Sequence, residues 1–434
     1  MSRKVSKKVI SVLLILIVLL SGCGKHSLAD ANSLTDTEGA IAAQSAGCVH
    51  GASSLTHICV TDAGVFYIDG TASGHFLCYY DYDADAHFVL CNAPECSHAN
   101  EECPAYFPNT ISIIGFAYYN DSLYLLQKGS EDTAYQLIQM SVNCEDKTVV
   151  STLSAGEGWN AESITDVYYC GGYAWIHATF LRYDDATKDW VTGQKLLAVR
   201  LSNGEIISLT DMLTGADNNL SYVAFQAISG SMVVWRTDHF ETPLLSSDAF
   251  YEQYGTESDY EEYRAQYYET TEISKNWWLL SLEDMKPVQI PFPGDIIVDF
   301  YQGQCLGIVQ NGNGETEILY DPKTEETQEL FSIQNGGILA RYQGEIFNLL
   351  YEGEQLLFME EQLDGSAQVC SYSLADGITT PLFKDDSSIT FRTIGETKDR
   401  LIGTIGTNPD RVWIWKEDYL KGNWSDAVRI ISGA

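Results

Sequence analysis

The segment DIIVDFYQGQCLGIVQNGNGETEILYDPKTEETQELF, residues 295–331, predicts the fold of the whole chain. It contains short apolar or alternating runs separated by turn signals, among them Asn311-Gly312-Asn313-Gly314 and Asp321-Pro322. Asn and Asp before Gly or Pro hydrogen-bond to their own backbone and reverse the chain. We therefore expect four short strands folded into one antiparallel unit.

Similar units precede and follow this segment. They cover His57–Asn92, Ser112–Leu153, Ser163–Leu209, a fourth unit that begins near Tyr222 and resumes at Trp277, Gly337–Phe383 and Ser388–Ile431. Four strands about every 40 to 50 residues are typical of the blades of a β-propeller. We predict an all-β propeller of about seven blades, with six or eight blades, or a pair of β-sandwiches, as the alternatives.

The composition supports a β-rich exported protein and excludes one class of partner. The chain has 26 Tyr, 16 Phe, 35 Gly and 10 Pro, which favours strands and turns over helices. Its 60 acidic and 25 basic residues give a formal charge of −35. A phosphate-binding face needs clustered Lys and Arg, so no nucleic acid is expected as a partner.

The N-terminus has the pattern of a lipoprotein signal. Four cations in residues 1–8 precede an apolar run from Val9 to Leu20, and Leu20-Ser21-Gly22-Cys23 follows. The run is short for a membrane-spanning helix, and small residues before Cys23 are what lipidation requires. We predict a signal peptide over residues 1–22 and a diacylglyceryl, palmitate-type anchor on Cys23 at the extracellular face of the cell membrane. The alternative is an ordinary secretion signal with an incidental Cys.

Three segments are expected after cleavage. Residues 23–51 are small and polar and predict a flexible tether, and residues 52–434 predict the propeller domain. Residues 237–274 interrupt the fourth unit and predict a helical insertion, because Tyr260, Tyr263 and Tyr267 follow a helical period. These tyrosines, with Trp277, are candidate ligand-stacking residues; the alternative is that the stripe packs against its own blade.

The densest chemical signal is CNAPECSHANEEC, residues 91–103. Three thiols and one imidazole, from Cys91, Cys96, His98 and Cys103, match the ligand count and softness of a tetrahedral zinc site. A disulfide with Cys48, Cys59 or Cys78 is an alternative in an exported protein, and free thiols in a tight turn are another. The remaining cysteines, Cys144, Cys170, Cys305 and Cys370, are expected to be small buried hydrophobic residues.

The lipobox, the strand units and the segment Cys-x4-Cys-x-His-x4-Cys-Pro-Ala-Tyr-Phe together resemble a family of β-propeller surface lipoproteins of anaerobic Gram-positive bacteria. In that family a similar Cys/His stretch follows the first blade. The family has no established activity, so the resemblance implies an architecture and a location rather than a reaction.

The sequence favours a binding function over catalysis. It contains no HExxH, G-x-S-x-G or P-loop motif, and no catalytic residue is predicted. The preferred hypothesis is a recognition module for a glycan, a peptide or a protein. The alternatives are a carbohydrate-active enzyme with carboxylates at the central channel and a structural or assembly protein of the cell envelope.

Overall fold

The structure is a computed structural model that describes residues 49–51 and 58–431, apart from 99, 130–133, 155–158, 185–188, 214–219, 243, 246, 256–258, 313, 335, 339–349, 352–354, 363–365, 386–390 and 406–409. The signal peptide, Cys23, Cys48 and most of the expected tether lie outside the described residues. Within the described part, no helix is long and apolar enough to cross a membrane.

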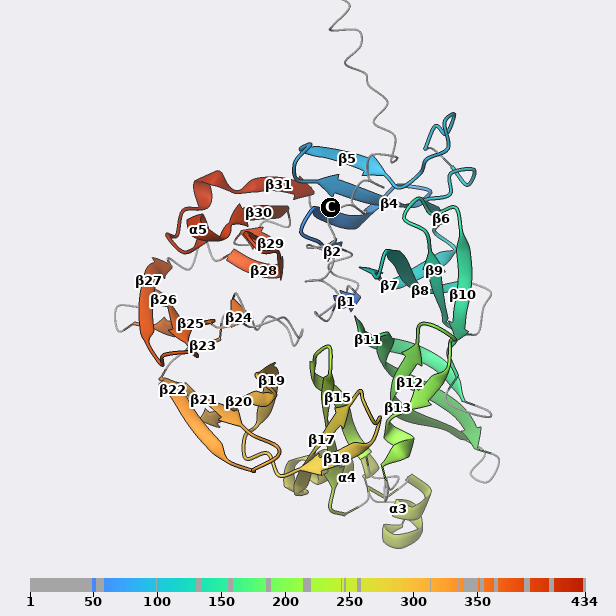
Figure 1. Cartoon of the computed structure of the whole chain (residues 1–434). Helices are drawn as coiled ribbons and strands as arrows, with labels where there is room; N and C mark the ends of the chain where they lie inside the picture. The colour runs from blue at the N-terminus through green and yellow to red at the C-terminus, as the bar shows by residue number, and fades with distance from the viewer. Residues whose placement is uncertain are drawn as a thin grey trace, which may run out of the picture.

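Seven antiparallel sheets stand in a ring, and each is one blade of a β-propeller (Figure 1). The all-β prediction and the count of seven blades are confirmed.

The strands of the first four blades follow the predicted units. Blade 1 contains β2 (Ile58–Val60), β3 (Gly64–Gly70), β4 (Gly74–Asp81), β5 (Ala86–Val89) and β6 (Tyr106–Pro108). Blade 2 contains β7 (Ile111–Tyr119), β8 (Ser122–Gly129), β9 (Gln136–Met140) and β10 (Lys147–Thr152). Blade 3 contains β11 (Asn160–Cys170), β12 (Tyr173–Asp184), β13 (Asp189–Arg200) and β14 (Ile206–Ser208), and blade 4 contains β15 (Leu220–Ile228), β16 (Met232–Phe240), β17 (Ile273–Ser281) and β18 (Pro287–Ile290).

The last three blades repeat the plan. Blade 5 contains β19 (Ile296–Tyr301), β20 (Gln304–Asn311), β21 (Gly314–Tyr320) and β22 (Thr327–Ile333). Blade 6 contains β23 (Gly336–Ile338), β24 (Leu350–Tyr351), β25 (Gln355–Glu361), β26 (Ala367–Ser373) and β27 (Thr379–Asp385). Blade 7 contains β28 (Phe391–Glu396), β29 (Arg400–Ile405), β30 (Arg411–Trp415) and β31 (Val428–Ile431).

The helices are short and lie outside the sheets. Two of them, α3 (Ser247–Tyr254) and α4 (Tyr260–Thr270), connect β16 to β17, and α5 (Lys416–Tyr419) follows β30. Single 3-10 turns are η2 (Thr210–Met212) and η3 (Trp424–Asp426). The predicted insertion, residues 237–274, is longer than the segment between the two strands. Residues 237–240 continue β16, residues 273 and 274 already belong to β17, and the two strands pair there.

The core lies between neighbouring blades, where aromatic and aliphatic side chains from facing sheets interlock. One cluster joins blades 1, 2 and 3 to blade 7, and four smaller clusters fill the remaining junctions. Trp175 and Trp235 are fully buried in the junction between blades 3 and 4. Each buried ring removes about 150–250 Å² from water, so the blade junctions supply most of the hydrophobic stabilisation. The four scattered cysteines are buried as predicted.

Among the described strands none is shared between blades 7 and 1, and contacts that involve side chains join these two blades. The Trp413 indole donates to the Tyr80 hydroxyl at 3.4 Å. The Arg400 guanidinium stacks over Tyr82 at 4.7 Å and over Trp415 at 4.3 Å. Cation–π contacts of this kind contribute about 0.5–2 kcal/mol each, so several are needed to replace a shared strand.

The N-terminal strand β1 (Val49–Gly51) pairs with the inner strand of blade 3 instead. Its register is antiparallel, with Val49 opposite Tyr169 and Gly51 opposite Val167 of β11. Figure 1 shows β1 near the middle of the ring, where it also lies close to β2 and β7. The expected tether therefore ends before Val49, and its last three residues belong to the propeller.

Candidate metal centre and binding pocket

The Cys/His segment interrupts the outermost strand of blade 1. The Leu90 N–H donates to the Leu77 carbonyl at 3.0 Å, and the Leu77 N–H donates to the Ala105 carbonyl at 3.0 Å. The chain therefore leaves the ladder and rejoins it at the same residue of β4. Residues between Leu90 and Ala105 form an excursion, and β5 and β6 are the two halves of one outer strand (Figure 1).

The return of the chain requires a glycine on β4. Gly74 lies opposite Pro108 in the β4–β6 register. A Cβ atom at Gly74 would lie 2.4 Å from the Phe107 carbonyl oxygen and 2.6 Å from the Tyr106 ring. Any side chain there would therefore force β6 away from the blade.

Four ligand atoms converge in this excursion, from Cys91, Cys96, His98 and Cys103. All four lie within 4.8 Å of one another. In a tetrahedral zinc site with Zn–S distances of about 2.3 Å, the ligand atoms are roughly 3.8 Å apart. Small side-chain rotations would bring the three sulfur atoms and the imidazole nitrogen to that separation. The cluster predicted from the sequence could therefore hold a metal ion.

Backbone turns place the sulfur atoms. The Cys96 N–H donates to the Ala93 carbonyl at 3.1 Å, and the Cys103 N–H donates to the Asn100 carbonyl at 3.0 Å. The His98 N–H donates to the Cys96 sulfur at 3.4 Å, and His98 has a φ of 51°. Such N–H donors stabilise a thiolate and fix its direction toward a metal.

The three thiols differ in acidity because they differ in environment. Burial raises the pKa of Cys103 to about 12 and also raises the pKa of Cys91. The pKa of Cys96 is lowered, chiefly by the hydrogen bond from the His98 backbone. Without a metal the buried pair is protonated, so metal binding must release protons.

Blade 2 braces the excursion from outside. The Lys147 ammonium on β10 donates to the Pro104 carbonyl at 2.8 Å and lies 4.4 Å from the centre of the Phe107 ring. These contacts tie the end of the Cys/His segment to the neighbouring blade. A metal there would stiffen the junction between blades 1 and 2.

The described cysteines are all free thiols, including two of the suggested disulfide partners. The Cys59 sulfur accepts the Tyr118 N–H at 3.3 Å in the junction between blades 1 and 2. Cys78 lies beside Tyr67 on the neighbouring strand, and burial raises its pKa to about 12. The third suggested partner, Cys48, lies outside the described residues.

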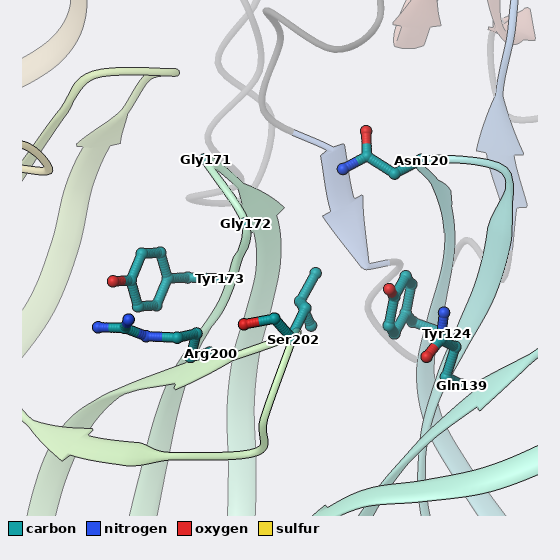
Figure 2. A pocket seen from close by; sticks show the side chains of 9 residues that line it. Asn120, Tyr124, Gln139, Gly171, Gly172, Tyr173, Arg200 and Ser202 are labelled. Carbon is teal, nitrogen blue, oxygen red and sulfur yellow. The ribbon is translucent and has the colours of Figure 1, made fainter.

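A second site, which sequence reasoning did not find, is a pocket of about 450 Å³ between blades 2 and 3. Its lining residues come from the turns and strand ends at one rim of the ring: Asn120, Tyr124, Gln139, Gly171, Gly172, Tyr173, Arg200, Leu201 and Ser202. Figure 2 shows Tyr173 and Arg200 on one side of the Gly171-Gly172 turn, and Asn120, Tyr124 and Gln139 on the other. The volume suits a small polar ligand.

Two tight hairpin turns shape this pocket. Asn120-Asp121 joins β7 to β8 and Gly171-Gly172 joins β11 to β12, and all four residues have positive φ. This geometry is typical of two-residue type I′ turns, which match the twist of the strands. The Gly172 N–H donates to the Tyr119 hydroxyl at 3.0 Å and holds the two turns together. The dipeptides Asn-Asp and Gly-Gly are hairpin signals in the sequence, but the sequence does not show that these two turns lie next to each other.

The pocket is chemically unusual for so acidic a chain. Its described lining includes the Arg200 guanidinium and no carboxylate. Arg200 stacks 5.4 Å from the Tyr173 ring and pairs with Glu205 at 3.3 Å beyond the lining. Burial raises the pKa of Tyr124, so its hydroxyl stays protonated. Amides, hydroxyls, one cation and aromatic rings can together recognise a neutral or anionic polar molecule.

The predicted stacking residues of the insertion point inward. The Tyr260 hydroxyl donates to the Leu245 carbonyl at 2.9 Å, and the Tyr263 hydroxyl accepts the Leu245 N–H at 3.4 Å. Tyr267 is buried, and its hydroxyl donates to the Thr242 carbonyl. Phe250 of α3 packs against the Tyr260 and Tyr263 rings, with centroids 5.4 and 4.8 Å apart.

Trp277 is also buried, in the junction between blades 4 and 5. Its ring packs against Phe292 with centroids 5.0 Å apart. In this conformation the rings of Trp277 and Tyr267 are not accessible to a ligand. This agrees with the alternative stated above, that the tyrosines of the insertion pack inward rather than stack on a ligand. The cap of α4 is Asp259, whose carboxylate accepts the N–H groups of Glu261 and Glu262.

Comparisons with known proteins find structural similarity at low sequence identity. Neither a family model nor a curated protein matches the sequence. Among solved structures, an oligogalacturonate lyase in complex with manganese is 11% identical, with a TM-score of 0.46 over 84% of this chain and 89% of that chain. Dipeptidyl peptidase 4 of Porphyromonas gingivalis is 10% identical, with a TM-score of 0.47 over 88% of this chain and 55% of that chain.

A third similar structure is the β-propeller domain of the trilobed protease of Pyrococcus furiosus. It is 10% identical, with a TM-score of 0.35 over 62% of this chain and 71% of that chain. The arrangement of seven antiparallel sheets in a ring itself defines the chain as a β-propeller.

Proposed function

We propose that this protein is a lipid-anchored lipoprotein of the extracellular face of the cell membrane, and that its propeller is a recognition module. The pocket between blades 2 and 3 carries this proposal, because it is a concave site of ligand size lined by polar and aromatic groups. Its ligand class is a glycan or a peptide that presents hydroxyl, amide or carboxylate groups. The anchor rests on the lipobox at Cys23.

A pair of matched substitutions tests the pocket. Ser202 lies in the turn Leu201-Ser202-Asn203-Gly204, and Ala375 lies in the turn Leu374-Ala375-Asp376-Gly377 of blade 6. The two glycines have φ of 73° and 71°, and in each turn the Asx side chain accepts the N–H two residues later. Ser202 and Ala375 are both exposed, so Trp at either position is tolerated by the fold to the same degree.

The readout is ligand binding by saturation-transfer NMR to residues 24–434. The probes are soluble neutral, N-acetylated and carboxylated oligosaccharides, and short peptides with free and amidated C-termini. We expect one class to bind, S202W to abolish the binding and A375W to leave it unchanged. Binding that survives S202W, or no binding by any probe at millimolar concentration, would contradict the proposal.

We propose further that Cys91, Cys96, His98 and Cys103 bind zinc as a structural ion. The convergence of three sulfur atoms and one imidazole supports this, because soft thiolate sets of four favour Zn²⁺ in closed sites. The ion would clamp the excursion in the outer strand of blade 1.

A further inference from the structure

The propeller has two distinguishable faces. The pocket face carries the turns that join the first strand of a blade to the second and the third to the fourth, such as Gly171-Gly172 and Leu201–Gly204. The insertion face carries the connections between the second and third strands, and α3 and α4 lie there between β16 and β17. The binding pocket and the helical insertion therefore lie on opposite faces of the ring.

The N-terminal strand enters from the pocket face. β11 ends at Cys170, immediately before the Gly171-Gly172 turn, so β11 runs toward the pocket face. β1 is antiparallel to β11, and Val49 lies opposite Tyr169 at the pocket-face end. The N-terminal end of β1 therefore lies on the pocket face, near the centre of the ring (Figure 1).

We infer that the anchored protein stands with its pocket face toward the membrane and its insertion face outward. This inference rests on the proposed lipidation of Cys23. Residues 24–48 separate Cys23 from Val49, and a coil of that length spans roughly 25–30 Å. A strand of eight residues is about 26 Å long, so a tether that began at the pocket face would have to extend well beyond its average span to pass around the ring.

Charge favours the same orientation independently. Residues 241–272 of the insertion carry nine acids, Glu241, Asp248, Glu252, Glu257, Asp259, Glu261, Glu262, Glu269 and Glu272, against the single cation Arg264. Anionic lipid headgroups repel such a segment within about a Debye length of the surface. The insertion is thus held away from the bilayer, where a partner outside the cell can reach it. A ligand of the pocket, in contrast, must come from the envelope side.

Fluorescence distance to the membrane tests this orientation. The mature protein, which begins at Cys23 and is purified from cell membranes, is reconstituted in vesicles of phosphatidylethanolamine and phosphatidylglycerol that carry a trace of headgroup-labelled acceptor lipid. Because the chain has eleven cysteines, the donor is attached through an azide-bearing amino acid at Ala375 on the pocket face or at Gln253 on α3. We expect strong energy transfer from position 375 and weak transfer from position 253. Equal or reversed transfer would overturn the orientation.

Two further measurements separate the possible failures. If the unlabelled protein does not float with vesicles, the lipid anchor itself is refuted and the orientation falls with it. If it floats but the two positions transfer equally, the orientation alone is refuted. In H50P, which removes a backbone N–H of β1, we expect unchanged flotation and a smaller difference between the positions. An undiminished difference would show that β1 does not set the orientation.

Discussion

Blade 5 and blade 1 follow the same plan, but among the described residues only blade 1 contains a Cys/His cluster. Blade 5 has four consecutive strands joined by short turns. Blade 1 has the same inner strands, while its outer strand is split into β5 and β6 around the Cys/His excursion. The comparison teaches that the repeat defines the scaffold, and that the candidate metal ligands lie where blade 1 departs from the repeat.

The largest expected effect is a difference in stability between a cysteine substitution in blade 1 and one in blade 5. In C103A we expect loss of the bound metal and of about 3 kcal/mol in stability, because the excursion between residues 91 and 103 is no longer closed by a cross-link. In C305A of blade 5, which removes a buried thiol that belongs to no metal-ligand cluster of the described residues, we expect a loss of about 1 kcal/mol. Chemical denaturation with metal analysis checks both. Equal losses with unchanged metal content would contradict the metal centre.

The second expected effect concerns how each blade is joined to its neighbour. W413A removes the indole that contacts Tyr80 and Tyr82 across the seam between blades 7 and 1, at a cost of about 3–5 kcal/mol. F292A, in the connection between blade 4 and blade 5, removes a ring of similar burial, at a similar cost.

Hydrogen exchange distinguishes the two variants. W413A should increase exchange in blades 1 and 7 together, because no described strand links them. F292A should increase exchange only around blades 4 and 5. If exchange in W413A rises in blade 7 alone, the account of ring closure is incorrect.

A smaller effect is expected at the brace between blades 1 and 2. K147M removes the hydrogen bond to the Pro104 carbonyl and the contact with the Phe107 ring, at a cost of about 1–2 kcal/mol. We expect faster hydrogen exchange in residues 100–108. K323M, at an exposed turn position of blade 5, should change stability by less than about 0.5 kcal/mol. Identical hydrogen exchange in both variants would show that Lys147 does not stabilise the contact between blades 1 and 2.

The smallest effect should be the same in both blades. The Asp81 carboxylate in blade 1 accepts the N–H groups of Asp83 and Ala84, and the Asp321 carboxylate in blade 5 accepts those of Lys323 and Thr324. We expect D81A and D321A each to lose about 1 kcal/mol, since both turns lose the same pair of acceptors. Thermal denaturation checks this. If the stability losses of D81A and D321A differ by more than about 1 kcal/mol, the two turns are not structurally equivalent.

The scaffold was predictable because its signals are local. The strand order within a blade is predicted by alternating runs such as those of residues 295–331 and by turns such as the one at Asp321. The number of blades is predicted by the number of such units in the chain. The four ligands of the Cys/His cluster were predictable for the same reason, since all lie within thirteen residues.

The rest depends on contacts between distant segments. Asn120, Gly171 and Ser202 meet only because two blades stand side by side, so no run of sequence marks the pocket. The pairing of β1 with β11 joins Val49 to Tyr169 and skips two blades. From the sequence, Tyr260 and Tyr263 could pack inward or face a ligand. Their contacts with Phe250 and with the Leu245 backbone, which the sequence does not show, fix the inward packing.

Metal content tests the central claim most directly. Residues 24–434 would be purified without added metal, analysed for zinc and other metals, and titrated for free thiols, beside H98A. The account predicts about one zinc per chain, with a markedly lower content in H98A. Absence of metal together with fewer free thiols than the ten cysteines of residues 24–434 would contradict it, and would indicate that a disulfide closes the excursion in blade 1.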